Sequence, residues 1–396
     1  MNMNEQMKES EESILHTYNR FPVVFEKGQG CYLYDSEGKE YLDFAAGIAV
    51  NSLGYHYPGY DEALKDQIDK LMHISNLYYN EPIIEAGAKL VKASKMSKAF
   101  FTNSGTEAIE GALKAAKKYA YVRDGHADHE IIAMNHSFHG RSIGALSVTG
   151  TAHYREPFEP LMGGVKFADF NDLESVKAQI TDKTCAIITE VVQGEGGIYP
   201  AKKEFLEGLR QICDEKDIIL IFDEIQCGMG RTGHYFAWQA YGVQPDIMTN
   251  AKALGCGVPV GAFVLGEKAA KASLEPGDHG TTYGGNPFVC AAVSKVFDIY
   301  ENDKIIEHVQ ETAPYLEQKL DELVAKHECA ATRRGMGFMQ GIVIQGRPVG
   351  EVVKAALAKG LLVISAGSDV LRIVPPLVIT KEHIDKMAAI LDECME

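Results

Sequence analysis

The sequence predicts an α/β fold in which amphipathic helices cover both faces of a mainly parallel sheet. Three observations support this prediction. First, compact apolar runs of strand length recur between residues 99 and 265. Second, stretches with helical spacing of apolar residues lie between these runs. Strands that are apolar along their whole length are typical of parallel sheets buried on both faces. The third observation is the length of 396 residues, which allows one large or two coupled domains.

The N-terminal part should form a small antiparallel meander. The first segment, Met1–Ser13, is polar and acidic, and we expect it to be disordered. From Val23 to Phe44, short apolar runs alternate with glycines and with the turn Asp35–Gly38, a pattern that favours short antiparallel strands.

Six strands are expected in the middle of the chain, with helices between them. The expected strands are Ala99–Thr102, Glu130–Met134, Cys185–Val192, Ile218–Phe222, Asp246–Thr249 and Gly261–Leu265. After about Asn286, two long helical stretches precede three more short strands and a last helix. These are Phe338–Ile344, Leu361–Ser365, Leu371–Val374 and the helix Thr380–Glu396.

Composition excludes several classes of function. The formal net charge is −16 and both signs are scattered, so the chain lacks the basic face that nucleic acids and anionic membranes require. No apolar run approaches membrane-spanning length. The eight cysteines form no CxxC pair and no zinc-site spacing, which indicates buried free thiols in a reducing compartment. We therefore expect a cytoplasmic protein.

The first candidate site segment is Phe101–Glu107, between an expected strand and an expected helix. Its small hydroxyl and glycine residues leave backbone N–H groups free at a helix N-terminus, which favours a phosphate or carboxylate site. Taken alone, the segment is explained equally well as an ordinary helix N-cap.

The second candidate is Asp223, which follows the apolar run Ile218–Phe222. A carboxylate at the end of a buried strand needs a cationic partner, whether Arg, Lys, a metal or a protonated ligand nitrogen. The next segment, Gly228–Gly233, matches the GxGxxG pattern of dinucleotide sites. However, the acid precedes the glycines and no helix start follows them, so this match alone is weak.

The third candidate is Lys252, which ends the strand Asp246–Thr249 and is followed by glycines. A lysine in an apolar setting loses its proton more easily and can form a Schiff base, although a lone lysine is more often a solvated surface residue. In chain order, the three segments offer a cradle for a phosphate, an acid for a ring nitrogen and an amine for an aldehyde. These are the contacts that pyridoxal phosphate requires.

The sequence resembles the class-III pyridoxal-phosphate aminotransferases of fold type I. The resemblance runs in family order over essentially the whole chain. The segments that carry it are Phe44–Val50, Asn103–Glu107, His136–Arg141, Gln193–Gly197, Phe222–Gly233, Pro245–Leu254, His279–Pro287 and Leu371–Pro376.

The resemblance implies roles for individual residues. Lys252 is implied to form the Schiff base, Asp223 to bind the pyridinium nitrogen and Phe138 to stack on the ring. Further cofactor contacts are implied for Ser104, Gly105, Thr106, Glu224, Ile225 and Gln226, and for Thr282, which reaches the phosphate of the partner subunit. Substrate carboxylates are implied to bind Arg141 and Arg372, with Thr281 nearby, and Glu195 to mask Arg372 while an ω-amino substrate is bound.

The resemblance also implies a domain division and a reaction. A large cofactor-binding domain would span residues 51–287, and a smaller α+β domain would combine residues 1–50 and 288–396. The implied enzyme is a homodimer with shared active sites that moves the ω-amino group of N-acetylornithine to 2-oxoglutarate. Ornithine, succinylornithine, 4-aminobutyrate and succinyl-diaminopimelate stay open as donors.

Two further alternatives come from other classes: a nicotinamide oxidoreductase, suggested only by Gly228–Gly233, and a non-catalytic cofactor-binding regulator. No metal site is expected, because His56, His136 and His139 are better explained as structural residues.

Overall fold

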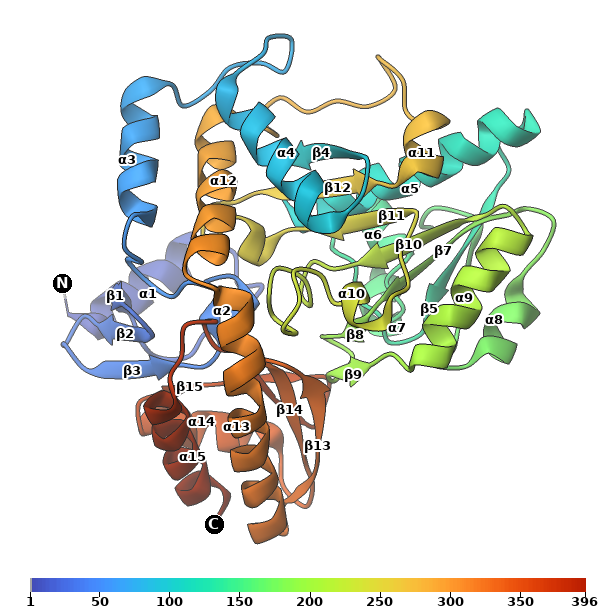
Figure 1. The fold of residues 1–396 in the computed structure, drawn as a ribbon. Helices are drawn as coiled ribbons and strands as arrows, with labels where there is room; N and C mark the ends of the chain where they lie inside the picture. The colour runs from blue at the N-terminus through green and yellow to red at the C-terminus, as the bar shows by residue number, and fades with distance from the viewer. Residues whose placement is uncertain (1) are drawn as a thin grey trace.

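A seven-stranded sheet forms the centre of the computed structural model, which describes residues 2–396 (Figure 1). Its strand order is β4-β12-β11-β10-β7-β5-β6, and β12 alone among these strands runs antiparallel to its neighbours. The mainly parallel sheet predicted from the sequence is therefore confirmed. The strands are β4 (Lys98–Thr102), β5 (Glu130–Met134), β6 (Val165–Ala168), β7 (Thr184–Glu190), β10 (Ile219–Asp223), β11 (Ile247–Asn250) and β12 (Gly261–Leu265).

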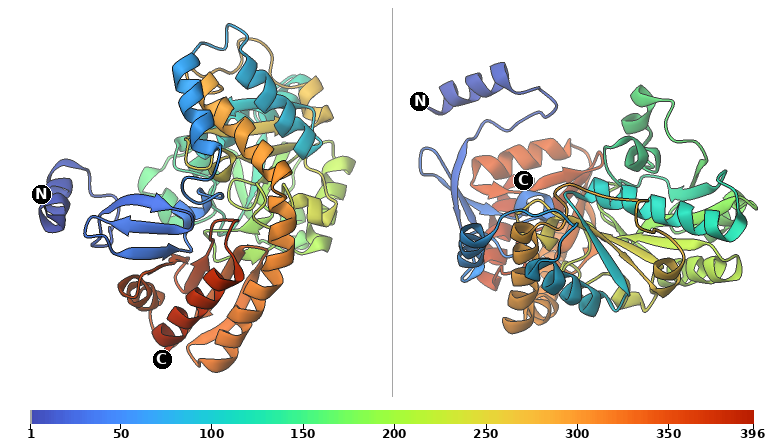
Figure 2. Two further views of the ribbon diagram at one scale, coloured as in Figure 1. Left: turned by 60° about the vertical axis from the view of Figure 1, so that its left-hand side comes forward. Right: turned by 90° about the horizontal axis from the view of Figure 1, so that it is seen from above.

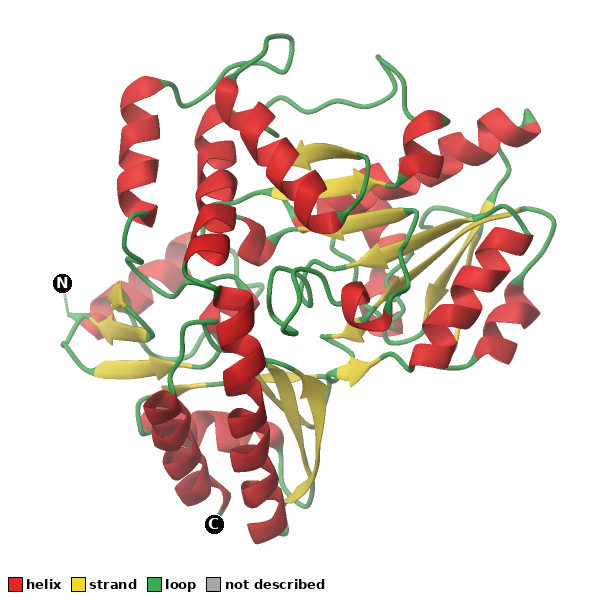
Figure 3. Cartoon of the chain, viewed as in Figure 1, coloured by secondary structure: helices red, strands yellow, loops and turns green. Residues whose placement is uncertain are grey.

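Helices cover both faces of this sheet (Figure 3). In β10, Ile219 and Ile221 pack with α5, α6 and α11, whereas Leu220 and Phe222 belong to the core on the other face with α4, α9, α10 and α12. Alternate residues of one apolar strand thus fill two separate cores. The covering helices are α4 (Glu81–Ser94), α5 (Gly105–Asp124), α6 (Ile143–Ser147), α9 (Lys203–Glu215), α10 (Trp238–Tyr241), α11 (Glu267–Lys271) and α12 (Pro287–Asn302).

The two ends of the chain meet in a pair of four-stranded sheets. One has the order β1-β2-β3-β15, in which Leu361–Leu362 pairs in parallel with Leu42–Asp43, and the other has the order β13-β14-β17-β16. Their strands are β1 (Phe25–Gln29), β2 (Tyr32–Asp35), β3 (Glu40–Asp43), β13 (Ala330–Met336), β14 (Met339–Ile344), β15 (Leu361–Leu362), β16 (Ile364–Ala366) and β17 (Val370–Ile373). The N-terminal meander predicted from the sequence is confirmed.

The remaining elements are short, except for two long helices near the C-terminus. They are α2 (Ala46–Ala49), α3 (Tyr60–Lys70), α7 (Ala152–Arg155), α8 (Leu173–Gln179), α13 (Ile305–Lys326), α14 (Val349–Ala358), α15 (Lys381–Met395), β8 (Val192–Gln193), β9 (Tyr199–Pro200) and the 3₁₀ turns Glu156–Phe158 and Lys252–Leu254. Helix α12 packs on α3 and α4, whereas α13 packs on α15. The division into residues 51–287 on one side and residues 1–50 with 288–396 on the other stays a prediction.

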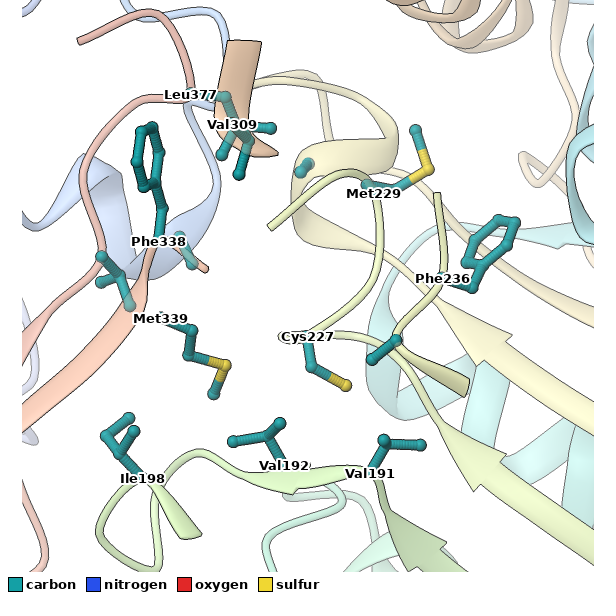
Figure 4. Close-up of a cluster of buried hydrophobic side chains, with 14 of the residues drawn as sticks. Val191, Val192, Ile198, Cys227, Met229, Phe236, Val309, Phe338, Met339 and Leu377 are labelled. Atoms are coloured by element: carbon teal, nitrogen blue, oxygen red, sulfur yellow. The ribbon is translucent and has the colours of Figure 1, made fainter. Parts of the chain in front are cut away.

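An apolar cluster connects the loops after β7 and β10 with the C-terminal elements (Figure 4). It brings Val191, directly after β7, and Val192 of β8 together with Cys227 and Met229 from the loop after β10. From the C-terminal part come Val309, Phe338, Met339 and Leu377. The loops that follow β7 and β10 are thus held between two packed bodies.

The first residues form a helix, so the expectation of a disordered segment is wrong for residues 3–13; Met1 lies outside the described residues. Helix α1 (Met3–Ser13) begins with a capping box, in which Asn2 accepts from the Glu5 N–H and Glu5 from the Asn2 N–H. None of its residues is buried, and Figure 2 shows it projecting from the body of the molecule. The residues of this capping box, Asn2 and Glu5, are visible in the sequence and could have indicated the helix.

Other differences from the sequence analysis are small. Strands β6 and β13 were not expected, and the stretch Leu361–Ser365 divides into the two short strands β15 and β16. Among the described residues, no helix has the length and apolar character needed to cross a membrane.

The contact between α5 and β12 depends on Gly111. A Cβ at this position would lie 2.2 Å from Cε1 of Phe263, whose ring is buried and stacked on Phe100. We expect Gly111→Ala to lower the free energy of unfolding by about 1–3 kcal/mol, because the buried ring has no room to move. Thermal melting followed by circular dichroism measures the effect.

Gly350 provides the matched control. It also lies in a helix, α14, but a Cβ there meets nothing within 4 Å. Gly350→Ala should leave the melting temperature unchanged or raise it slightly. Equal effects of the two substitutions would contradict the close approach of α5 to β12.

Candidate active site

The carboxyl ends of five parallel strands meet at one edge of the central sheet. Asp223 ends β10, Glu190 ends β7, and Lys252 follows β11 by two residues. The loop after β4 holds Ser104, and the loop after β5 holds Phe138. The three candidate segments of the sequence therefore lie together, at the edge where open α/β sheets bind ligands.

A cavity of about 490 Å³ lies at this edge, a size typical of small-molecule sites. Most of the predicted site residues line it: Ser104, Gly105, Thr106, Phe138, Arg141, Asp223, Ile225, Gln226 and Lys252. The structure thus brings the cradle, the acid and the lysine into one enclosed space.

The cradle is the N-terminus of α5. Ser104 is its N-cap and accepts a hydrogen bond from the Glu107 N–H at 3.3 Å, so the N-cap expectation holds as well. The N–H groups of Gly105 and Thr106 precede it and have no partner within the helix. Gly140, at φ +137°, lies so close that a Cβ would be 2.4 Å from Oγ1 of Thr106. The first turn of a 20-residue helix therefore faces the cavity with free donors.

Asp223 is buried and held by three donors. Its Oδ1 accepts from the Ile225 N–H at 3.0 Å and from Oγ1 of Thr249 at 3.1 Å, and its Oδ2 lies 2.7 Å from Nδ1 of His139. These contacts fix the orientation of the carboxylate, which lines the cavity.

Glu190 is a site residue that the sequence analysis missed. It lies directly beside Asp223 in the β7–β10 register and accepts from the N–H groups of Phe138 at 3.0 Å and Gly194 at 2.9 Å. Burial raises the pKa of Glu190 to about 7, and the neighbouring Asp223 carboxylate acts in the same direction. The sequence could have indicated Glu190 in the same way as Asp223, because it too is an acid at the end of a buried apolar strand.

Lys252 lies on the wall of the cavity at the start of a 3₁₀ turn. Its φ of +51° is in the left-handed region, which is costly for a residue with a side chain. Burial lowers the pKa of Lys252 to about 8, although the carboxylate of Glu195 acts in the opposite direction. Within residues 2–396 its Nζ makes no hydrogen bond or ion pair, so the amine is free to react.

Arg372, which is buried, and Glu195, which is half-buried, form an ion pair next to the cavity. Nη1 of Arg372 donates to Oε1 of Glu195 and, at 3.2 Å, to Oε1 of Gln226, a cavity residue. Burial raises the pKa of Glu195, but the attraction of Arg372 outweighs it and the net shift is downward. The Glu195 carboxyl group therefore stays ionised at neutral pH.

A second cavity, of about 1050 Å³, lies on the far side of the Gly194–Gly197 loop. Glu195, Tyr154 and Arg334 line it. Nε of Arg334 donates to the carbonyl of Gly197 at 2.6 Å, which ties this loop to strand β13.

Besides Glu195 and Arg372, three predicted site residues do not line the first cavity. The buried carboxylate of Glu224 accepts from the N–H groups of Ala237 and Trp238, both at 2.8 Å, and so supports the start of α10. Thr282 is exposed, and Thr281 reaches the cavity only through Asn103, whose Nδ2 donates to its Oγ1 at 3.2 Å.

The segment Gly228–Gly233 forms a turn rather than the start of a helix. Its Arg231 is fully buried and donates to the carbonyls of Phe338 and Pro375. This geometry differs from that of a dinucleotide loop, because the side chain at the centre of the GxGxxG match packs into the interior.

The reactivity of Lys252 gives a test that depends on pH. Its ammonium form is unreactive and the neutral amine is nucleophilic, so reductive methylation by formaldehyde should speed up as pH rises, with a midpoint near pH 8. Mass spectrometry of peptides from the purified protein, freed of bound small molecules, measures the rate at each pH.

Lys319 is the control in the same experiment. A hydrogen bond from Lys319 to the Glu322 carboxylate raises the pKa of this lysine, so its methylation should rise only at higher pH. If Lys252 followed the same curve as Lys319, the desolvation of Lys252 would be disproved.

Known proteins are similar to this chain in sequence and in fold. The model of the family Aminotransferase class-III matches residues 14–395. An acetylornithine aminotransferase from Clostridium acetobutylicum is 48% identical over 388 residues, which cover 98% of this chain and 100% of the relative.

Two solved structures show the same architecture. An N-acetylornithine aminotransferase from Stenotrophomonas maltophilia has a TM-score of 0.84 and 35% identity, with 98% of each chain covered. An ornithine aminotransferase from Toxoplasma gondii has a TM-score of 0.95 and 28% identity, covering 100% of this chain and 95% of that one. With its lysine, acid and cradle at one sheet edge, the chain belongs to the class-III aminotransferase family and is an aminotransferase.

Proposed function

We propose that the chain binds pyridoxal 5'-phosphate in the first cavity and transfers the ω-amino group of N2-acetyl-L-ornithine to 2-oxoglutarate. The products are N-acetylglutamate 5-semialdehyde and glutamate, a step of arginine biosynthesis. The name and the 48% identity of the Clostridium acetobutylicum relative support this donor. Because all eight cysteines are free and seven are buried, we place the reaction in the cytoplasm.

The observation that carries the proposal is how well the residues present fit the cofactor. The free N–H groups of Gly105 and Thr106 suit a phosphate, and the fixed, buried carboxylate of Asp223 suits a protonated ring nitrogen. The unpartnered amine of Lys252 suits an aldehyde, and Phe138 on the wall offers a flat apolar face. Ser104, Ile225 and Gln226 complete the wall.

When bound, pyridoxal phosphate supplies an aldehyde that takes up the amino group and a ring that accepts the electrons released at the substrate carbon. The chain's own residues do the rest. Asp223, oriented by His139 and Thr249, would keep a proton on the ring nitrogen. The neutral amine of Lys252 would act as the base that takes a proton from the substrate carbon, and its ammonium form as the acid that returns it.

Two arginines provide for the carboxylates of the substrates. Arg141 is exposed on the first cavity and has no ion pair within the described residues, whereas Arg372 is buried and paired with Glu195. We assign Arg141 to the carboxylate remote from the reacting amine. Arg372 would bind an α-carboxylate, and Thr281 would act on the site through its hydrogen bond with Asn103. Glu195 neutralises Arg372 while the ω-donor is bound and yields when 2-oxoglutarate or glutamate arrives.

The proposal includes a homodimer with shared sites. Thr282 is exposed and does not line the cavity of its own chain, as expected of a residue that serves the phosphate of a partner. Near it, Tyr283 is 62% exposed, and Leu77 and Tyr79 are 86% and 95% exposed, so this region leaves large side chains with apolar surface uncovered, as a subunit interface would.

Single-turnover kinetics test the donor. The visible absorbance of the bound cofactor should fall fastest with N-acetylornithine, and more slowly with ornithine, succinylornithine, 4-aminobutyrate and succinyl-diaminopimelate at equal concentration.

Lys252→Ala should reduce the rate of the same reaction by at least about a hundred- to ten-thousandfold, because the proton-transfer base is lost. A faster reaction with another donor would transfer the assignment to that donor, and turnover of the alanine variant within tenfold of wild type would refute the role of Lys252.

The role of Glu195 predicts a change in substrate preference. Glu195→Ala leaves Arg372 free, so the glutamate half-reaction should speed up about tenfold relative to the acetylornithine half-reaction, equivalent to about 1.4 kcal/mol. Stopped-flow measurement of the two half-reactions gives this ratio.

Asp369 is the matched control for this variant. Its exposed carboxylate lines the same second cavity as Glu195, yet it makes no ion pair among the described residues. Asp369→Ala should therefore leave the ratio unchanged. An unchanged ratio in Glu195→Ala, with folding intact, would mean that Glu195 does not control access to Arg372.

A further inference from the structure

The side chain of Arg141 is held by aromatic rings rather than by polar partners. Over the described part of the chain, its guanidinium makes no hydrogen bond and no ion pair. Its carbon Cζ lies 4.0 Å from the centre of the Tyr154 ring and 5.3 Å from the centre of the Phe138 ring. The nearer ring is therefore that of Tyr154, a residue for which the sequence analysis gave no role.

Tyr154 is itself fixed in place. It lies in α7, and its ring meets that of Phe138 edge-on, with 5.9 Å between centres and an angle of 80°. Oγ1 of Thr151, at the start of α7, donates to the carbonyl of Ser137 at 3.3 Å, and the Gly150 N–H donates to the same carbonyl at 3.1 Å. The helix that carries Tyr154 is thus hydrogen-bonded to the loop that carries Phe138 and Arg141.

The two cavities are separated by this group of side chains. Phe138 and Arg141 line the first cavity, whereas Tyr154 lines the second together with Glu195. The Tyr154 ring therefore contacts Arg141 without itself lining the first cavity.

We propose that Tyr154 is the positioning residue for Arg141 and thereby sets the affinity of the site for the carboxylate remote from the reacting amine. The proposal rests on the proposed function, which assigns that carboxylate to Arg141. A cation–π contact uses none of the hydrogen-bond donors of the guanidinium, so the ring orients the cation without competing with a substrate. An acidic partner would orient Arg141 too, but a substrate carboxylate would have to displace it.

This arrangement affects binding more than chemistry. An arginine that is free to rotate loses rotamer freedom when it binds a carboxylate, and a ring that already holds it removes part of that cost. Both N-acetylornithine and 2-oxoglutarate carry such a carboxylate, so KM should change for both. An amine without a carboxylate makes no use of Arg141, and its reaction should be unaffected.

Two variants of Tyr154 separate the ring from the hydroxyl. Tyr154→Leu should raise KM for N-acetylornithine and for 2-oxoglutarate roughly fivefold, with kcat changed less than twofold. Tyr154→Phe keeps the ring and should behave as wild type. The Kd of glutarate, an unreactive dicarboxylate, should rise by the same factor in calorimetry with the leucine variant, and the rate of cofactor bleaching by butylamine should stay the same.

The neighbouring pair of Arg155 and Phe167 supplies the control for damage to α7. The guanidinium of Arg155 lies 4.1 Å from the centre of the Phe167 ring, a contact of the same kind from the same helix, but neither residue lines the first cavity. Phe167→Leu should leave both KM values and the glutarate Kd unchanged.

A double-mutant cycle shows whether Tyr154 acts through Arg141. In an Arg141→Ala background, Tyr154→Leu should have no further effect on the glutarate Kd. Additive effects, unchanged affinities in Tyr154→Leu, or an equal loss with butylamine would each overturn the proposal. If the wild-type protein bound glutarate but did not use N-acetylornithine, the proposed donor would fail, and the glutarate cycle would still decide the role of Tyr154.

Discussion

The burial of charge at the carboxyl edge of the central sheet is the constraint on which the rest of the site depends. Five charged residues lie within a few residues of strand ends. Asp223, Glu190 and Arg372 are buried there, and Glu195 and Lys252 are half-buried. Each buried charge is either satisfied by fixed donors or paired, as in Asp223 and Arg372, or it shifts towards its neutral form, as in Glu190 and Lys252. These groups keep their positions because the loops that carry them pack against the central sheet on one side and against the C-terminal elements on the other.

Apolar patterning was enough to predict the central fold. Each of the six expected strands in the middle of the chain has an observed counterpart within about two residues of the expected bounds, because a strand buried on both faces reads as an unbroken apolar run. Strand β6, with the sequence Val165–Ala168, was missed because it carries Lys166 and lies at the sheet edge. Helix α1 was misjudged for the opposite reason: it buries nothing, and its only signal is local capping.

Site residues that belong to short contiguous motifs could be predicted from the sequence. Site residues whose role depends on packing between distant segments could be predicted less well. Ser104 to Thr106, Asp223 and Lys252 each end an apolar strand or begin a helix, and the structure places them on one cavity. Glu190 and Tyr154 were missed, since their relevance comes from strand register in one case and from ring stacking in the other. Glu224 illustrates the converse, because neighbours in sequence point to opposite sides of a strand end, and its carboxylate lies with Ala237 and Trp238.

The parallel pairing of β15 with β3 has a consequence for synthesis of the chain on the ribosome. All seven strands of the central sheet lie between residues 98 and 265, so this sheet can assemble while the rest is still being made. The N-terminal meander is made first, yet the edge of β3 obtains its partner only when Leu361–Leu362 has left the ribosome. For most of translation the meander therefore presents an open strand edge to its surroundings, and the cell must protect that edge until the last tenth of the chain arrives.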